Sequence, residues 1–393
     1  MAARSAIADL LSTKEMVIIC GSGGTGKTTI AAALGVQAAS VLGGKVLVLT
    51  VDPARRLATA LGLADLAVSG NDAVRVPSDS LRDANGNDPR GELWMAMLDT
   101  KAGWDELIQR HAPSPALAEQ VLANPLYRNI TSRFVHSHDY IAMERLHELH
   151  SAGLYDLVII DTPPSRNALD LLDAPRRMRE FFGSRLLRWL TVPYRSRLFT
   201  VASQPFYTVA DRVLGSRLLR DIAEFFMLFQ TMEKGFVARA NQVEQLLTDD
   251  RTTFIVVSTL DAAPAHEARY LVDELQRRRM PLGALVLNRT LPSSMRQPAA
   301  RKAASELGAA AADVAFTQQV ADTTPACTAD DVAAVMSSVA EYFPDLAVLA
   351  GREAERRREL EVRVPLHVDV PLLSGDITDV QALLTIGHRL VAQ

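Results

Sequence analysis

A glycine-rich segment near the N-terminus constrains the fold of this chain more than any other feature. It fits the phosphate-binding pattern G-x-x-x-x-G-K-[ST] and reads Gly21-Ser22-Gly23-Gly24-Thr25-Gly26-Lys27-Thr28. In this pattern the glycines let backbone N–H groups turn toward phosphate oxygens, the lysine reaches the β- and γ-phosphates, and the hydroxyl ligates Mg²⁺. We therefore expect these residues, together with Thr29, to bind the phosphates of a nucleotide.

The sequence on either side of this loop supports the same interpretation. An apolar run over 16–20 precedes it and predicts a buried strand, and an Ala-rich segment over 28–41 follows it with helical spacing. A strand, a glycine loop and a helix in this order direct the positive end of the helix at the bound anion. A glycine-rich turn with a surface lysine is the alternative, and the flanking pattern disfavours it.

Length, charge and cysteine content narrow the class of protein. At 393 residues the chain exceeds the size of one hydrophobic core, so we expect a core with a subdomain. The net charge of −4 gives no general attraction to nucleic acid. Cys20 and Cys327 are too far apart in the sequence to indicate a disulfide framework or a Cys-x-x-Cys metal site, which fits a reducing compartment. With neither a visible signal peptide nor an uncharged apolar stretch near ~18 residues, we expect a cytoplasmic protein without a spanning helix.

Short apolar runs alternate with helical segments along the chain. The runs that predict strands are 16–20, 45–50, 93–98, 155–161, 253–258, 283–288 and 367–370. This alternation predicts an α/β fold of the phosphate-loop NTPase type, with a mostly parallel sheet covered by helices on both faces and an inserted helical subdomain. We expect core segments over 1–98, 151–172 and 250–393, a helical insertion over 99–150 and the helical subdomain over 173–249. Within the last core segment, 330–343 and 347–361 read as two separate helices.

Two aspartates follow predicted strands and can meet the loop at the carboxyl edge of the sheet. Asp161 ends an apolar strand as the Mg²⁺-holding Asp of phosphate-loop NTPases does, so we expect Thr28 and Asp161 to hold Mg²⁺. Asp52 follows the strand 45–50 and could orient or deprotonate an attacking water, and we include it among the metal-site residues. Capping of the next turn or helix is the structural alternative for each aspartate.

Four further segments resemble one known family. Asp52-Pro53-Ala54-Arg55-Arg56-Leu57 resembles the first switch, and Asp161-Thr162-Pro163-Pro164-Ser165-Arg166-Asn167 the second switch, of the arsenite-efflux and tail-anchored-protein-targeting ATPases. Val286-Leu287-Asn288-Arg289 resembles the segment that contacts adenine in that family, and Val370-Pro371-Leu372-Leu373 resembles a late loop that packs near the base. The likeness is strongest to the actinobacterial branch, in which two paralogous chains occur as a pair.

The resemblance implies an ATPase that uses ATP and Mg²⁺ and works as a dimer. By this likeness Asp52 activates water, Lys27 acts in catalysis, Asn288 and Pro371 lie at the base, and the segment from Thr162 onward senses the γ-phosphate. The metalloid-binding cysteine cluster of the arsenite ATPase and the Cys-x-x-Cys zinc motif of the eukaryotic targeting ATPase are both missing from this sequence. Arsenite export and a zinc-clamped homodimer are therefore disfavoured.

Ser22 is a second departure from the family pattern, G-K-G-G-x-G-K-[ST]. The first lysine of that pattern reaches the partner's phosphates across the dimer, and a trans cation of this kind can contribute roughly 10³–10⁵ in rate. Serine has neither the charge nor the reach. The sequence leaves three interpretations open: an ordinary loop with an incidental serine, replacement by an arginine of the switch segments, and a heterodimer with a lysine-bearing paralogue. We favour the heterodimer, with a homodimer as the alternative.

The sequence does not decide what the helical subdomain binds. Ten arginines and seven aromatic residues interleave between residues 176 and 220. A solvated arginine face, a protein client and an anionic membrane surface all fit this composition, whereas nucleic acid fits it least. The preferred function is an ATP-hydrolysing dimeric switch whose nucleotide state controls binding of a protein. A nucleotide-sensing regulatory subunit with little turnover and a surface-positioning ATPase are the alternatives.

Overall fold

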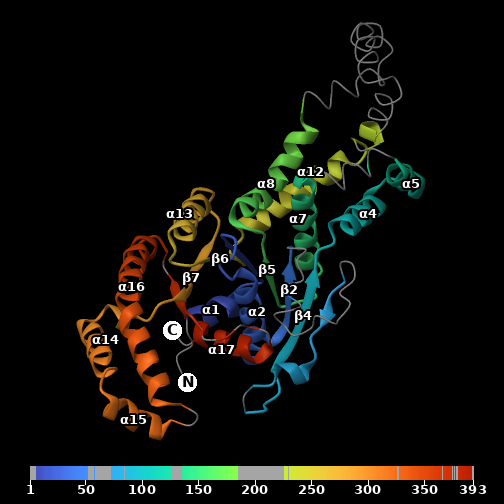
Figure 1. Cartoon of the computed structure of the whole chain (residues 1–393). Coiled ribbons are helices and arrows are strands. Elements are labelled where there is room, and N and C mark those ends of the chain that lie inside the picture. The colour runs from blue at the N-terminus through green and yellow to red at the C-terminus, as the bar shows by residue number, and fades with distance from the viewer. Residues whose placement is uncertain are drawn as a thin grey trace.

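The sheet of the computed structural model contains eight strands in the order β3-β4-β2-β5-β1-β6-β7-β8 (Figure 1). All neighbouring pairs are parallel except β3 and β4. The strands are β1 Met16–Gly21, β2 Gly44–Thr50, β3 Val74–Arg75, β4 Gly91–Met97, β5 Leu157–Asp161, β6 Thr252–Ser258, β7 Leu282–Thr290 and β8 His367–Pro371. The α/β fold class with a mostly parallel sheet is confirmed.

The structure describes most of the chain. The described residues are 6–51, 57, 72–83, 85–124, 127, 135–184, 225–228, 230–324, 327–364, 366–373, 375, 377 and 379–391, without the side chains of 100–101, 135–138 and 165–168. Most of the Arg-rich segment 176–220 therefore lies outside the described residues, as do the side chains of His136 and His138.

Helices cover both faces of the sheet. They are α1 Ala6–Thr13, α2 Lys27–Gln37, α4 Thr100–His111, α5 Pro115–Ala123, α7 Val135–Ser151, α8 Ser165–Phe182, α12 Glu233–Thr248, α13 Ala262–Arg277, α14 Pro298–Ala310, α15 Val314–Thr323, α16 Ala329–Glu361 and α17 Val380–Val391. A π-helix, Ala38–Leu42, continues α2, and two short 3₁₀ helices cover Ser78–Leu81 and Ser293–Arg296. In Figure 1, α4, α5, α7, α8 and α12 extend from one end of the sheet, and α14 to α16 form a lobe at the opposite side.

Alternation along the strands divides the core into two clusters. On β1, Val17 and Ile19 join the cluster of α2 and α17, whereas Met16 and Ile18 join the cluster of α7, α12 and α13. The strands are buried on both faces, as parallel strands between two helical layers must be. This burial explains why the sequence shows continuous apolar runs at these positions.

The structure corrects the prediction of two helices near the C-terminus. One 33-residue helix, α16, continues through Pro344, where the sequence suggested a break. A capping box between Thr328 and Asp331 fixes its start, since each side chain accepts a hydrogen bond from the backbone N–H of the other residue. The antiparallel edge strand β3 was not predicted, because two residues are too short for a periodic pattern.

Helix α16 is relevant to the expectation that the chain has no membrane-spanning helix. Within the described part of the chain it is the one helix long and apolar enough to cross a membrane by length and composition, and 11% of its most apolar window is buried. One face of the helix packs against α14 and α15. Glu341 and Asp345 lie exposed in its central part.

Close contact between α2 and the sheet yields a test of the packing. A Cβ added at Gly35 of α2 would lie 2.3 Å from Cγ2 of Val48 on β2. We expect Gly35→Ala to lower the free energy of unfolding by roughly 1–3 kcal/mol, because overpacking outweighs the gain in helix propensity. Urea unfolding measures the change.

The matched control is the same substitution in open space. At Gly351 of α16 an added Cβ meets nothing within 4 Å. Gly351→Ala should therefore raise the free energy of unfolding by about 0.5–1 kcal/mol through helix propensity alone. Equal stabilisation by both substitutions would contradict the close packing of α2 on β2.

Candidate functional site

The glycine loop connects the end of β1 to the start of α2 through backbone conformations that favour glycine. Gly24 and Gly26 have φ of 77° and 93°, in the left-handed region. Gly21 lies against β6, where an added Cβ would be 2.1 Å from the carbonyl oxygen of Val257. Gly26 occupies the cap position of α2 and has no side chain with which to cap it. The first N–H groups of α2 thus face the loop without a side-chain cap from Gly26, as an anion site at a helix N-terminus requires.

Lys27 is held by its own loop. Its side chain is buried, and Nζ donates a hydrogen bond of 3.0 Å to the carbonyl oxygen of Ser22. The hydroxyl of Thr25 donates to the same oxygen, also at 3.0 Å. The Ser22 carbonyl oxygen therefore accepts two hydrogen bonds that hold the loop in its closed shape. The lysine ammonium lies within this loop, where we expect phosphate to bind.

Asp161 and Thr28 meet as the sequence predicted. In the parallel pairing, Asp161 of β5 is opposite Ile19 of β1 and Thr50 of β2. Its buried Oδ2 accepts hydrogen bonds from the hydroxyl of Thr28 at 2.6 Å and from the hydroxyl of Thr50 at 3.1 Å. A carboxylate and a hydroxyl are the hard oxygen donors that Mg²⁺ binds, so this pair fits the ion.

Several predicted site residues belong to segments that the structure does not describe. Asp52, Arg55 and Arg56 lie outside the described residues, and so does the side chain of Arg166. Their roles stay predictions. Thr29 lies half-buried in the first turn of α2.

Asn288 reaches from β7 to the loop. Its Nδ2 donates a hydrogen bond of 2.8 Å to the carbonyl oxygen of Thr25, and its Oδ1 accepts one of 3.0 Å from the N–H of Arg289. An added Cβ at Gly26 would lie 2.3 Å from Nδ2. The amide therefore holds the loop in place, a role that sequence reasoning did not assign. The second N–H of Nδ2 leaves room for the predicted base contact.

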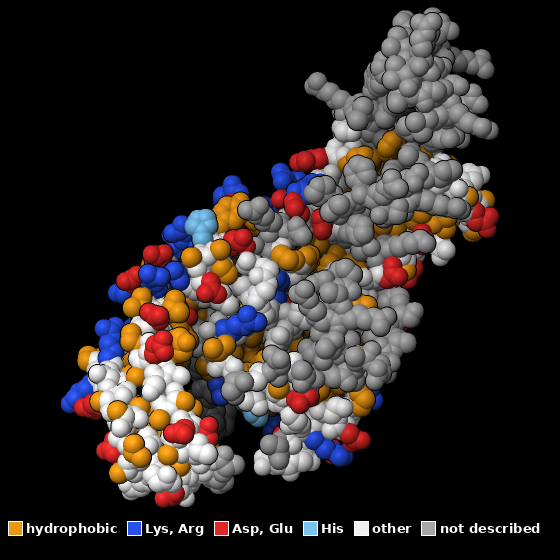
Figure 2. All heavy atoms as spheres, in the orientation of Figure 1, with side chains coloured by type: hydrophobic (Ala, Val, Ile, Leu, Met, Phe, Trp, Pro, Cys, Tyr) orange, Lys and Arg blue, Asp and Glu red, His pale blue; other side chains and the backbone are white. Residues whose placement is uncertain are grey.

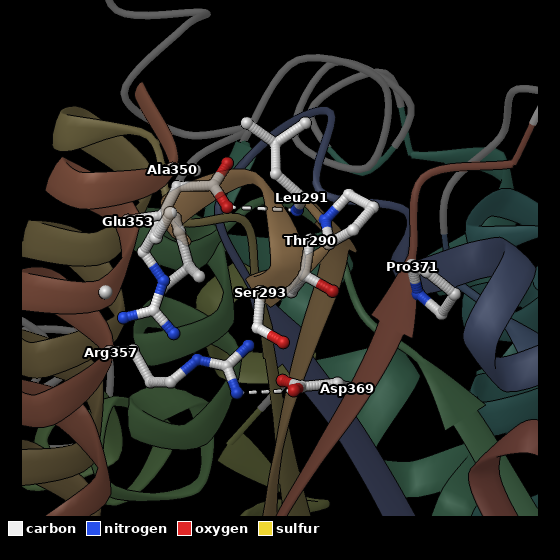
Figure 3. A pocket seen from close by; sticks show the side chains of 12 residues that line it. Thr290, Leu291, Ser293, Ala350, Glu353, Arg357, Asp369 and Pro371 are labelled. Carbon is white, nitrogen blue, oxygen red and sulfur yellow. Dashed lines mark hydrogen bonds and ion pairs between the residues drawn. The ribbon is translucent and has the colours of Figure 1, made fainter. Parts of the chain in front are cut away.

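A cavity of about 320 Å³ opens at the carboxyl ends of β7 and β8, beside Pro371 (Figure 3). Helix α16 forms its other wall, and Figure 3 shows Glu353 and Arg357 extending from that helix toward the strands. The lining residues are Leu260, Thr290, Leu291, Pro292, Ser293, Arg296, Ala350, Glu353, Ala354, Arg357, Asp369 and Pro371. The position of α16 at this edge was not predicted, because no local pattern shows which helix returns to a given strand end.

Two polar contacts fix that wall. Oε2 of Glu353 accepts a hydrogen bond of 3.0 Å from the N–H of Leu291, and burial raises the pKa of this carboxyl. Arg357 forms an ion pair with Asp369 of β8. The α16 wall is thus attached both to the end of β7 and to β8.

The described surroundings of Cys20, Glu144 and His150 are those of structural residues. Burial raises the pKa of the Cys20 thiol to about 12, so it is neither a thiolate ligand nor a nucleophile at neutral pH. On α7, Glu144 bonds to Tyr140 and Arg239, and His150 bonds to Glu15 at 2.7 Å. Among the described residues no group of three or more His, Cys, Asp or Glu could hold a metal ion.

The parallel sheet, the glycine loop and the strand-end aspartate define a phosphate-loop NTPase. The family model described as anion-transporting ATPase matches residues 14–329, and the chain belongs to that family. This confirms the resemblance seen in the switch motifs, and the protein is an ATPase.

Curated relatives agree with this assignment. The ATPase GET3 of Lachancea thermotolerans is 26% identical over 71% of this chain and 73% of its own length. The putative arsenical pump-driving ATPase 2 of Aquifex aeolicus is 24% identical over 70% of this chain and 79% of its own length. The uncharacterized protein SCO2128 of Streptomyces coelicolor, an actinobacterial relative, is 28% identical over 70% of this chain and 62% of its own length.

The two roles of Asn288 can be separated by nucleotide binding. Asn288→Ala removes the hydrogen bond to Thr25 and loosens the loop, so binding of both ADP and GDP should weaken by roughly tenfold. A base contact would add a further loss for ADP alone. Calorimetric titration of both nucleotides measures the two effects, and unchanged GDP binding would contradict the loop-holding role.

Proposed function

We propose that the chain is the ATP-hydrolysing subunit of a dimeric cytoplasmic switch, whose nucleotide state controls binding of a protein partner. The contact between the Thr28 hydroxyl and the Asp161 carboxylate carries this proposal, because it joins the phosphate loop to the end of β5. The division into core segments and helical insertions at the boundaries given above forms part of the same proposal.

In the proposed reaction the loop N–H groups and Lys27 bind the phosphates. Thr28 and Asp161 would hold Mg²⁺, directly or through water, and Asp52 belongs to the same proposed site. When bound, the ion neutralises charge on the β- and γ-phosphate oxygens. Asp52 orients the attacking water. The water oxygen bonds to the γ-phosphorus while the bond to the β–γ bridging oxygen breaks, giving ADP and inorganic phosphate.

The base is proposed to lie toward β7 and β8. Adjacent strands are about 4.8 Å apart, so β7 and β8 lie roughly 10–14 Å from the loop that follows β1. This offset suits a nucleotide that extends from its phosphates to its base across the strand ends. Asn288 of β7 extends its amide to the loop, and Pro371 ends β8 one strand farther on, which supports their assignment to the base and the preference for ATP.

The dimer is proposed to contain a lysine-bearing paralogue. The Ser22 side chain carries no charge, and its carbonyl is already engaged by Lys27 and Thr25. Ser22 and Gly23 lie at the accessible side of the loop, with an added Cβ at Gly23 only 3.8 Å from Pro164 of the second switch segment. A cation supplied by another chain would complete the site at this side. A membrane surface stays open as a further partner of the helical subdomain.

Replacement of Lys27 or Asp161 tests the assignment of the site. Lys27→Ala and Asp161→Asn should each lower ATP turnover by at least about 10²-fold, because each removes charge that stabilises the transferring phosphoryl group. Release of phosphate measures turnover. Cys20→Ala, one residue before the loop, is the control and should keep most of the activity. Full turnover by either site variant would contradict the assignment.

Because Ser22 stands where the family pattern has a lysine, we predict that ATP turnover depends on a partner chain. The chain alone should hydrolyse ATP slowly, and addition of the lysine-bearing paralogue should raise turnover by about 10²-fold or more. The paralogue with its lysine replaced by serine is the matched control and should give no rise. Light scattering should show a heterodimer that forms with ATP. Fast ATP turnover by a homodimer of this chain alone would contradict the paired arrangement. Slow turnover with tight ATP binding, even in the heterodimer, would support the regulatory-subunit alternative.

A further inference from the structure

The lobe of α14, α15 and α16 has an apolar outer face. Met336 and Ala347 of α16 are buried, and the helix packs against α14 and α15. Of the fourteen large apolar side chains that are exposed among the described residues, eight lie on α15 and α16. Figure 2 shows hydrophobic side chains at the surface of this lobe, at lower left.

Five of these side chains form a line along α16, which we name the α16 seam. Their exposed fractions are Val335 62%, Val339 43%, Tyr342 60%, Leu346 36% and Leu349 47%. The spacings of four, three, four and three residues are those of the a and d positions of a heptad. Single exposed apolar residues are common on protein surfaces, but a contiguous line of this kind marks an interaction site. Heptad spacing is the geometry by which one helix receives the side chains of another.

The charges beside the seam indicate what kind of helix it receives. From Ala329 to Gly351 the charged residues of α16 are all acidic: Asp330, Asp331, Glu341 and Asp345. Asp345 lies three residues after Tyr342 and four before Leu349, so its carboxylate flanks the apolar line, and Glu341 lies four residues before Asp345 on the same side of the helix; both are exposed. An acidic flank attracts basic side chains and repels an anionic lipid surface. A second copy of α16 would bring the same acidic flank to the seam.

The position of α16 in the chain separates this surface from the shared ATPase core. The match to the anion-transporting ATPase family ends at residue 329, where α16 begins. The far end of the same helix supplies Glu353 and Arg357 to the cavity beside β7 and β8. The seam therefore lies on an element that follows the matched residues, on a helix that reaches the nucleotide edge of the sheet.

We propose that the α16 seam binds a helix of another protein, with apolar residues at heptad spacing and basic residues on its flanks. The apolar side chains of that helix pack between Val339, Tyr342 and Leu346. Its basic side chains pair with Glu341 and Asp345. This surface is separate from the proposed dimer contact at the phosphate loop.

Synthetic peptides of known charge test this proposal on the full-length chain. One three-heptad helical peptide carries leucine at the seam positions and lysine on the flanks, and a second carries glutamate on the flanks. Fluorescence anisotropy should show the lysine peptide binding at least about tenfold more tightly, with the preference weakening as salt is added. Equal affinity for the two peptides would refute the charge assignment.

Variants of the seam locate the binding. Val339→Asp with Leu346→Asp should abolish binding, and Glu341→Lys with Asp345→Lys should reverse the preference so that the glutamate peptide binds more tightly. Leu154→Asp is the matched control, because Leu154 is 59% exposed on a different surface. All variants should keep the wild-type circular dichroism spectrum and ATP turnover. Unchanged peptide binding by the seam variants would overturn the proposal.

Two further measurements decide between a helical partner and other occupants. Flotation with phosphatidylserine vesicles should leave the chain in the protein fraction, and seam-dependent flotation would identify a membrane surface in place of a protein helix. Light scattering should give the same mass for wild type and for the Val339→Asp, Leu346→Asp variant. A loss of mass in that variant would show that a second copy occupies the seam.

Discussion

The parallel pairing of β5 between β1 and β2 is the constraint on which the rest of the site depends. It brings the carboxylate of Asp161 beside the hydroxyls of Thr28 and Thr50, which belong to segments more than a hundred residues away in the sequence. A shift of one residue in β5 would turn this carboxylate to the other face of the sheet. The continuous apolar strands on each side exclude such a shift by their burial, so core packing and the position of the Asp161 carboxylate share one cause.

Local patterns in the sequence predicted most of this arrangement. The strand, loop and helix around Lys27 follow from glycine placement and hydrophobic periodicity, and the strand before Asp161 follows from its apolar run. The α16 wall of the cavity could not be predicted in this way. The approach of Glu353 to Leu291 depends on how a 33-residue helix returns across the sheet, and only tertiary packing determines that path. Continuation of α16 through Pro344 is a similar case, because contacts with α14 and α15 outweigh the helix-breaking tendency of one proline.

The two ends of α16 have different chemistry. Toward its N-terminus the helix is acidic and apolar and carries the seam, whereas toward its C-terminus it is rich in arginine and glutamate, of which Glu353 and Arg357 bond to the strand ends. Since helices are stiff over this length, a displacement of the seam end relative to the sheet would also move Glu353 and Arg357. The helix thus connects an outer surface mechanically with the nucleotide edge, without any change within the sheet itself.

The bond from Asn288 to Thr25 spans 263 residues of sequence. A ribosome therefore completes the phosphate loop early in synthesis, but the amide that fixes its shape is added only after about three quarters of the chain has been made. Nascent chains shorter than this contain the glycine motif but lack the hydrogen bond from Asn288 that holds it. Binding of nucleotide to the loop should therefore stay weaker until β7 has joined the sheet, so that tight binding coincides with completion of the fold.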